Sequence, residues 1–175
     1  MTEAPPRRRH DELDGLLGAL DGIPVIVHDR YLTVVGATRL ARAVSPFFRE
    51  GVNLARAAFL DDSVVESQTA WPEFAEHVAA TLRVELDRHD ADPEFRRLVG
   101  ELSARSRAFA RAFADDSGRQ RPSGSWVFGA DSPEPFTLAF HRLELPDAGD
   151  TVLVWRPDGP AAERALAAIA QTLPR

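Results

Sequence analysis

Two polar side chains of this 175-residue chain, Arg83 and Ser106, could bind the polar head group of a ligand. Arg83 follows Leu82 on a predicted helix, and a guanidinium at the mouth of a pocket can clamp a carboxylate through paired hydrogen bonds. The alternative for Arg83 is a surface or structural ion pair. Ser106 lies on the apolar face of the next predicted helix. Its hydroxyl could bind a ligand head group or bond back to the carbonyl of Leu102.

Catalytic and metal chemistry have little support in the sequence. Glu73 and His77 have the i, i+4 spacing of a helical metal pair, although such pairs often arise by chance. The chain has no cysteine, which excludes thiol nucleophiles, disulfides and cysteine-based zinc sites. It also contains no nucleophile elbow, phosphate-binding loop, dinucleotide fingerprint or HExxH motif. We therefore predict a protein that is not an enzyme, with no cofactor and no bound metal.

A set of large apolar side chains could line a pocket for an acyl chain. They follow helical spacing, and the same spacing is expected of residues that only build a core. The candidates are Trp71, Phe74, Val78, Leu82, Phe109 and Phe113. Together with Arg83 and Ser106 they form the predicted ligand-binding site.

Two long helices must position these side chains. Trp71 and Pro72 open the first, because proline is favoured in the first helical turn. Asp92 is a predicted N-cap, and apolar spacing over residues 95–113 predicts one continuous second helix. Shorter helices are predicted at residues 11–20, 39–44, 54–59 and 160–173, with Thr38 as the cap of the second of these.

Strands are predicted on both sides of the helical middle of the chain. β-Branched and alternating residues predict a hairpin from residues 24–28 and 31–35. A three-stranded meander follows later, at residues 125–128, 136–145 and 151–155. The order of elements predicts an α+β fold, with roughly five antiparallel strands and a helical layer over one face.

An ordered run of short motifs carries a family resemblance. The run comprises Asn53-Leu54, Phe59-Leu60-Asp61, Trp71, Leu82-Arg83, Asp92-Pro93-Glu94, Leu98-Val99-Gly100-Glu101-Leu102, Ser106 and Phe109. In this order and spacing it resembles the ligand-binding domain of MmyB-like transcription regulators, a PAS-like sensor domain. The resemblance extends from about Leu16 to Leu166. It implies a PAS-like fold with an apolar cavity between sheet and helices, and a fatty acid or other apolar acyl molecule as the ligand.

The resemblance also sets the expected organisation and partners. Residues 1–10 are predicted to be a disordered tail, and residues 11–175 a PAS-like sensor domain. Relatives carry a helix-turn-helix before this domain; we expect none in this protein and therefore predict no direct nucleic-acid binding. The net charge of −6 and the pI of about 5.4 agree with that prediction. The Arg7-Arg8-Arg9 triplet is expected to be a solvated tail.

Cellular location and association complete the predictions. The sequence has no signal peptide and no apolar run of membrane-spanning length, so we expect a cytoplasmic protein that does not contact membranes. A homodimer, or a heterodimer with a regulator, is the expected assembly. Two alternatives remain open: an interaction module that modulates a full-length regulator through the apolar face of residues 13–20, and an enzyme on a PAS-like scaffold.

Overall fold

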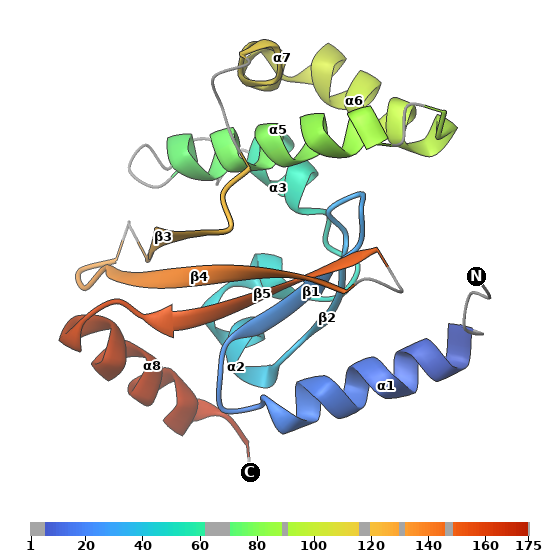
Figure 1. The fold of residues 1–175 in the computed structure, drawn as a ribbon. Coiled ribbons are helices and arrows are strands. Elements are labelled where there is room, and N and C mark those ends of the chain that lie inside the picture. The colour runs from blue at the N-terminus through green and yellow to red at the C-terminus, as the bar shows by residue number, and fades with distance from the viewer. Residues whose placement is uncertain are drawn as a thin grey trace.

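The computed structural model describes residues 6–61, 71–88, 91–115, 120–129, 132–145 and 149–174. Its strands form one five-stranded antiparallel sheet in the order β2-β1-β5-β4-β3 (Figure 1). They are β1 (Val25–His28), β2 (Val34–Ala37), β3 (Ser123–Phe128), β4 (Phe136–Leu145) and β5 (Asp150–Pro157). Pairing of β1 with β5 joins the hairpin to the meander. The predicted α+β class with about five antiparallel strands is confirmed.

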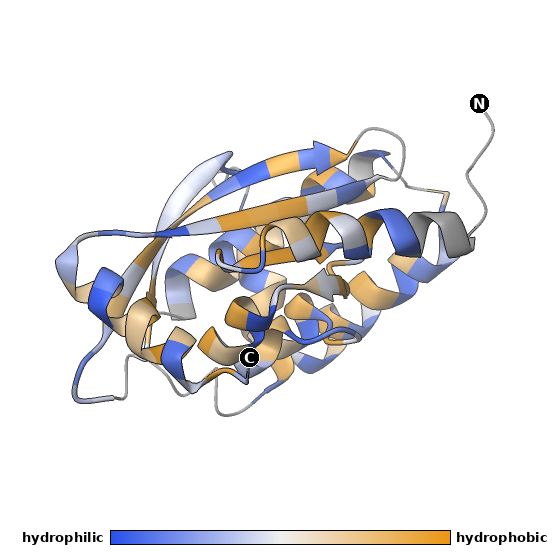
Figure 2. Cartoon of the chain, turned by 90° about the horizontal axis from the view of Figure 1, so that it is seen from below, coloured by the Kyte–Doolittle hydropathy of each residue, from blue (hydrophilic) through white to orange (hydrophobic). Residues whose placement is uncertain are grey.

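Helices lie on both faces of this sheet. They are α1 (Pro6–Ala19), α2 (Arg39–Val44), α3 (Leu54–Leu60), α5 (Trp71–Arg88), α6 (Pro93–Arg105), α7 (Arg107–Ala114) and α8 (Pro160–Thr172), with a 3-10 turn at Pro46–Phe48. The predicted helical layer consists of α3, α5, α6 and α7, whereas α1 and α8 lie on the opposite side (Figure 1). Hydrophobic and hydrophilic residues follow one another along the helices, as expected where one face is buried (Figure 2). None of the described helices is long and apolar enough to span a membrane.

The alternation of side chains along the strands divides the interior into two cores. Successive residues of a strand point to opposite faces of its sheet. Leu153 and Trp155 of β5 therefore belong to the main core with the helical layer. Val152 belongs to a smaller core with Val27 and with Leu17 of α1. The first helix thus packs on the sheet through apolar contacts separate from those of the main core.

Gly36 leaves room on β2 for the leucine side chains of α1. A Cβ at this position would lie 2.7 Å from Leu17 Cδ1 and 3.0 Å from Leu13 Cδ2. Leu13, Leu17 and Leu20 all pack into the smaller core, while Leu16 remains 38% exposed. The apolar face of residues 13–20, expected as a partner contact, is therefore largely covered by the sheet.

The predicted continuous helix over residues 95–113 is wrong, because Ser106 interrupts it. Ser106 has extended backbone angles, φ −128° and ψ 111°, and separates α6 from α7. Its hydroxyl accepts a hydrogen bond from the Phe109 N–H at 3.2 Å. Its backbone N–H, and not its hydroxyl, bonds to the Leu102 carbonyl. The predicted hydroxyl bond to Leu102 is therefore also wrong, since the hydroxyl caps the next helix.

The two N-terminal boundaries also differ from prediction. Helix α1 begins at Pro6 and not at residue 11, so residues 6–10, which were expected in a disordered tail, are helical; proline is favoured in a first helical turn. The second hairpin strand begins at Val34 and not at Tyr31. The Asp29 carboxylate accepts hydrogen bonds from the backbone N–H groups of Tyr31 and Thr33, at 2.9 and 2.8 Å. These bonds hold residues 29–33 in a turn before β2.

Candidate ligand-binding cavity

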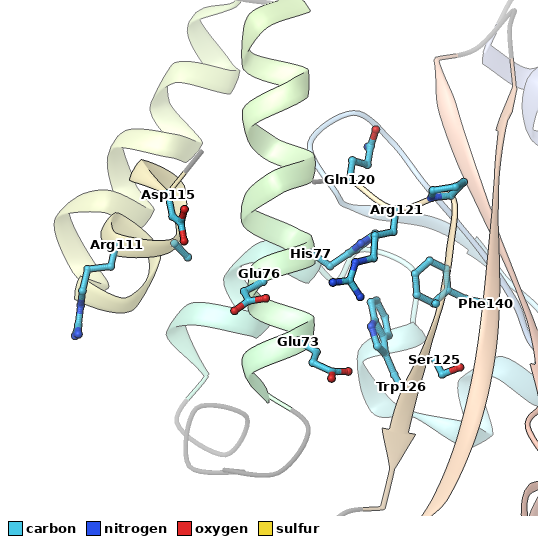
Figure 3. A pocket seen from close by; sticks show the side chains of 13 residues that line it. Glu73, Glu76, His77, Arg111, Asp115, Gln120, Arg121, Ser125, Trp126 and Phe140 are labelled. Atoms are coloured by element: carbon cyan, nitrogen blue, oxygen red, sulfur yellow. The ribbon is translucent and has the colours of Figure 1, made fainter. Parts of the chain in front are cut away.

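A cavity of about 710 Å³ opens between the helical layer and the β3–β4 hairpin. It is lined by Glu73, Glu76, His77, Arg111, Ala112, Asp115, Gln120, Arg121, Pro122, Gly124, Ser125, Trp126 and Phe140. These residues come from α5, α7, the segment before β3, and the two strands (Figure 3). The volume is that of a typical small-molecule site.

Aromatic rings form the floor of the cavity. The Trp126 ring lies 5.0 Å from that of Phe140 and 4.8 Å from that of Phe74, between ring centroids. Trp155, which is fully buried, lies 4.8 Å from Trp126. Gly124 pairs with Phe140 across the strands, and a Cβ there would stand 2.8 Å from Phe140 Cε1. Because Gly124 has no side chain, the Phe140 ring has room to lie at the floor of the cavity.

His77 is the polar group in this floor. Its ring stands 5.5 Å from that of Trp126 and 5.2 Å from that of Phe140. Its Nδ1 is buried and has no hydrogen-bond partner in the described part of the chain. Burial, followed by the charges of nearby cationic groups including Arg121, lowers the pKa of His77 to about 4. The imidazole is therefore neutral at pH 7, with one donor and one acceptor nitrogen.

Charged groups surround the opening. Figure 3 shows His77 reaching towards Arg121, Trp126 and Phe140, whereas Arg111 points away from them. Arg121 is exposed and makes no hydrogen bond or ion pair with the residues that the structure describes. The Gln120 amide nitrogen is a second buried polar atom without a partner among these residues. The cavity thus combines an aromatic floor with unpaired polar groups above it.

The residues predicted to bind a ligand lie elsewhere. Val78, Leu82 and Phe109 are buried in the main core, and Phe74 and Phe113 pack against it half-buried. The side chain of Trp71 lies outside the described residues. None of the predicted residues is among those that line the cavity. Phe74 contacts the cavity wall through its ring contact with Trp126.

Arg83 of α5 forms hydrogen bonds with the C-terminal end of α7. Its guanidinium donates hydrogen bonds to the carbonyl oxygens of Phe113 at 2.9 Å and Ala112 at 2.7 Å. It also lies 5.7 Å from the centre of the Phe113 ring. A cation at a helix C-terminus satisfies carbonyl groups that the helix itself leaves unpaired. Arg83 therefore joins α5 to α7, and a contact with a ligand carboxylate stays a prediction.

Replacement of Ser106 by alanine is expected to lower the free energy of unfolding by about 1 kcal/mol, because the Phe109 N–H loses its cap. Chemical denaturation of the two proteins measures the difference. Ser103, on the exposed face of α6, gives a matched control, and its replacement by alanine should change stability by less than about 0.5 kcal/mol. Equal stability of the Ser106 variant and the wild type would contradict the capping role.

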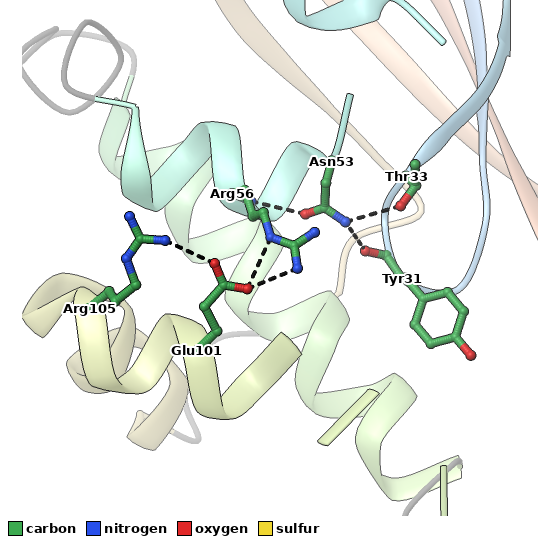
Figure 4. Close-up of polar contacts among 6 residues, drawn as sticks. All are labelled: Tyr31, Thr33, Asn53, Arg56, Glu101 and Arg105. Atoms are coloured by element: carbon green, nitrogen blue, oxygen red, sulfur yellow. Dashed lines mark hydrogen bonds and ion pairs between the residues drawn. The ribbon is translucent and has the colours of Figure 1, made fainter. Parts of the chain in front are cut away.

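Several motif residues hold the loops beside the helical layer. Asn53 accepts from the Arg56 N–H at 3.0 Å and donates to the Tyr31 carbonyl and the Thr33 hydroxyl (Figure 4). The Arg56 guanidinium bonds to Glu101 on α6 at 2.8 Å, and this bond lowers the pKa of the Glu101 carboxyl. Asn53 and Glu101, which carry the family resemblance, thus have structural partners.

The metal alternative gains no further ligand. Among the described residues, no group of three histidine, cysteine or acidic side chains could hold a metal ion. His77 faces the aromatic rings of Trp126 and Phe140, while Glu73 lies in the exposed rim. His77 thus contributes a nitrogen without a partner among the described residues to the wall of the cavity.

Most of the cavity was not predicted from the sequence. His77 is predicted only as half of a possible metal pair, and Arg121, Trp126 and Phe140 are not among the predicted site residues. A usable signal was the alternation within residues 123–128 and 136–145, which places Trp126 and Phe140 on one face of the sheet. The helical periodicity of α5 and α7, from which the ligand-binding residues were predicted, marks the faces of these helices that pack in the core.

Comparison with known proteins agrees with this picture. The family model of the MmyB-like transcription regulator ligand binding domain matches residues 10–169. No curated protein matches the chain. The match covers most of the sequence, including the sheet, the helical layer and the cavity between them. The chain therefore belongs to the family of MmyB-like transcription regulator ligand binding domains.

Proposed function

We propose that the chain is a small-molecule sensor that binds a fatty acid or other apolar acyl ligand in the cavity between α5 and the β3–β4 hairpin. The observation that carries this proposal is the amphipathic lining: an aromatic floor of Trp126 and Phe140 beside the exposed cation Arg121. Each acyl methylene buried on the floor contributes about 0.8 kcal/mol to binding. The carboxylate is then held at the rim by the guanidinium.

The predicted apolar residues keep a place in this proposal. A tail longer than the cavity would displace Phe74 and continue to Val78 and Leu82, one and two turns further along α5. Phe109 and Phe113 of α7 would flank that path, as α7 packs against α5. Trp71 and Ser106 stand at helix ends, and Arg83 of α5 bonds to the carbonyls at the end of α7, so all three would respond to ligand through these helices. Deepening of the cavity would therefore shift the helical layer relative to the sheet.

The output is proposed to pass to a DNA-binding partner in the cytoplasm, in a homodimer or in a heterodimer with a full-length regulator. A ligand shifts such an equilibrium by its difference in affinity for the two conformations. Movement of α5 and α7 supplies the second conformation. The family is one of regulator domains and not of enzymes, and the proposal requires no catalysis.

Replacement of Arg121 by glutamine is expected to weaken the binding of dodecanoic acid about 10-fold, because a charge-assisted hydrogen bond to the carboxylate is lost. Displacement of a fluorescent fatty acid measures the affinity, and native mass spectrometry of the purified protein shows whether an acyl molecule accompanies it. Arg156→Gln is the matched control, since Arg156 is exposed on the C-terminal strand and does not line the cavity. Absence of acyl binding to the wild type would refute the proposed function.

A further inference from the structure

We propose that the natural ligand carries a hydroxyl group within a few carbons of its carboxylate, and that His77 binds this hydroxyl. The proposal rests on the proposed function and names the class of ligand: a hydroxylated acyl chain. It is carried by His77 Nδ1, a buried polar atom in the cavity wall with no partner among the described residues. A purely apolar tail passing over it would leave this nitrogen unpaired.

The different depths of Arg121 and His77 determine which of them binds the ligand carboxylate and which binds the hydroxyl. Arg121 is exposed at the rim, whereas the His77 ring makes edge contacts with Trp126 and Phe140 in the floor. A carboxylate loses much hydration when it is buried, so it stays at the rim with the guanidinium. A hydroxyl is neutral and can be buried at the cost of one hydrogen bond, which His77 restores. Figure 3 shows the Arg121 and His77 side chains next to each other, so the carboxylate and the hydroxyl that they bind lie close together on the ligand.

The chemistry of a neutral imidazole selects a hydroxyl. The pKa of His77 is lowered to about 4, so one ring nitrogen donates and the other accepts at pH 7. A hydroxyl both donates and accepts, and it satisfies Nδ1 in either tautomer. The Gln120 amide nitrogen on the same cavity wall also has no partner in the described part of the chain, which favours a ligand with a polar substituent.

Calorimetric titration with dodecanoic acid and with each enantiomer of 3-hydroxydodecanoic acid tests the inference. The wild type is expected to bind one hydroxy acid about 3–10-fold more tightly than the plain acid, the range of a single net hydrogen bond. In His77→Phe this ratio is expected to fall to about one while the plain acid still binds, because phenylalanine keeps the ring contacts. His141→Phe, at an exposed position of β4, should keep the wild-type ratio.

A second measurement does not depend on any variant folding. In the wild type, nitrogen NMR should show the His77 Nδ1 resonance moving on addition of the hydroxy acid and far less with dodecanoic acid. Equal affinity for the two acids, or a preference that persists in His77→Phe, would overturn the hydroxyl proposal and leave the acyl sensor standing. Failure of the wild type to bind either acid would overturn both.

Discussion

Replacement of Phe109 by alanine is expected to lower the free energy of unfolding by about 3–5 kcal/mol, the usual cost of removing a fully buried aromatic ring. Phe109 has no exposed surface. Its ring packs edge-on to Phe59 at 5.0 Å and stacks on Phe113 at 5.1 Å, between centroids. The contacts join α3 to α7, so the cavity left by alanine lies inside the helical layer and not at its surface.

Urea denaturation of wild type and variant measures this loss. Leu16→Ala is the control, because Leu16 is 38% exposed on α1 and its truncation should change stability by less than about 0.5 kcal/mol. A loss below about 1 kcal/mol at Phe109 would show that the ring is not held as the structure places it. A stabilisation by acyl ligand that is larger in the variant than in the wild type would instead support the prediction that Phe109 lines an extended pocket.

Acidification from pH 6.5 to about 4 is expected to cost several kcal/mol of stability. Burial lowers the pKa of both His28 and His77 from 6.5 to about 4 in the folded protein. Between those two values the unfolded chain binds more protons than the folded one, so stability falls as pH falls. One pKa unit corresponds to about 1.4 kcal/mol for each group. The stability contributed by the neutral histidines is fully present above pH 6.5.

Denaturation at a series of pH values checks this slope, with the double variant His28→Asn, His77→Phe as the comparison. Asparagine at 28 can keep the hydrogen bond to the Asp29 carbonyl that His28 Nδ1 makes at 2.8 Å. Carboxyl groups with lowered pKa, such as Glu101, act below about pH 4.5, and the raised pKa of Asp29 opposes the histidine effect. A slope between pH 6.5 and 5 that is equal in the two proteins would contradict the assignment.

Local signals predicted most of the elements correctly. Thr38 caps the helix that starts at Arg39, and Asp92 with Pro93 opens α6, as the residue types indicate. The interruption at Ser106 escaped prediction because serine fits a helix face and a helix cap equally well, and tertiary packing chooses between them. The hairpin boundary escaped because Tyr31 has high strand propensity, while the Asp29 carboxylate holds it in a turn.

The cavity could not be located from periodicity. Its walls come from His77, Arg121, Trp126 and Phe140, which are brought together by strand register and by the packing of α5 on the sheet. Helical spacing reports which side of a helix is buried, and it does not separate a packed core from the wall of a hollow. That His77 Nδ1 has no partner among the described residues can be recognised only from the three-dimensional structure.

Strand β5 separates the main core from the smaller core under α1. Trp155 faces the aromatic cluster beneath the cavity, and the preceding residue Val154 packs with the core under α1. The two side chains share one peptide linkage, so a rotation of this strand tilts both at once. A displacement of Trp155 by a molecule bound against Trp126 would therefore also be expected to move the surface on which α1 packs.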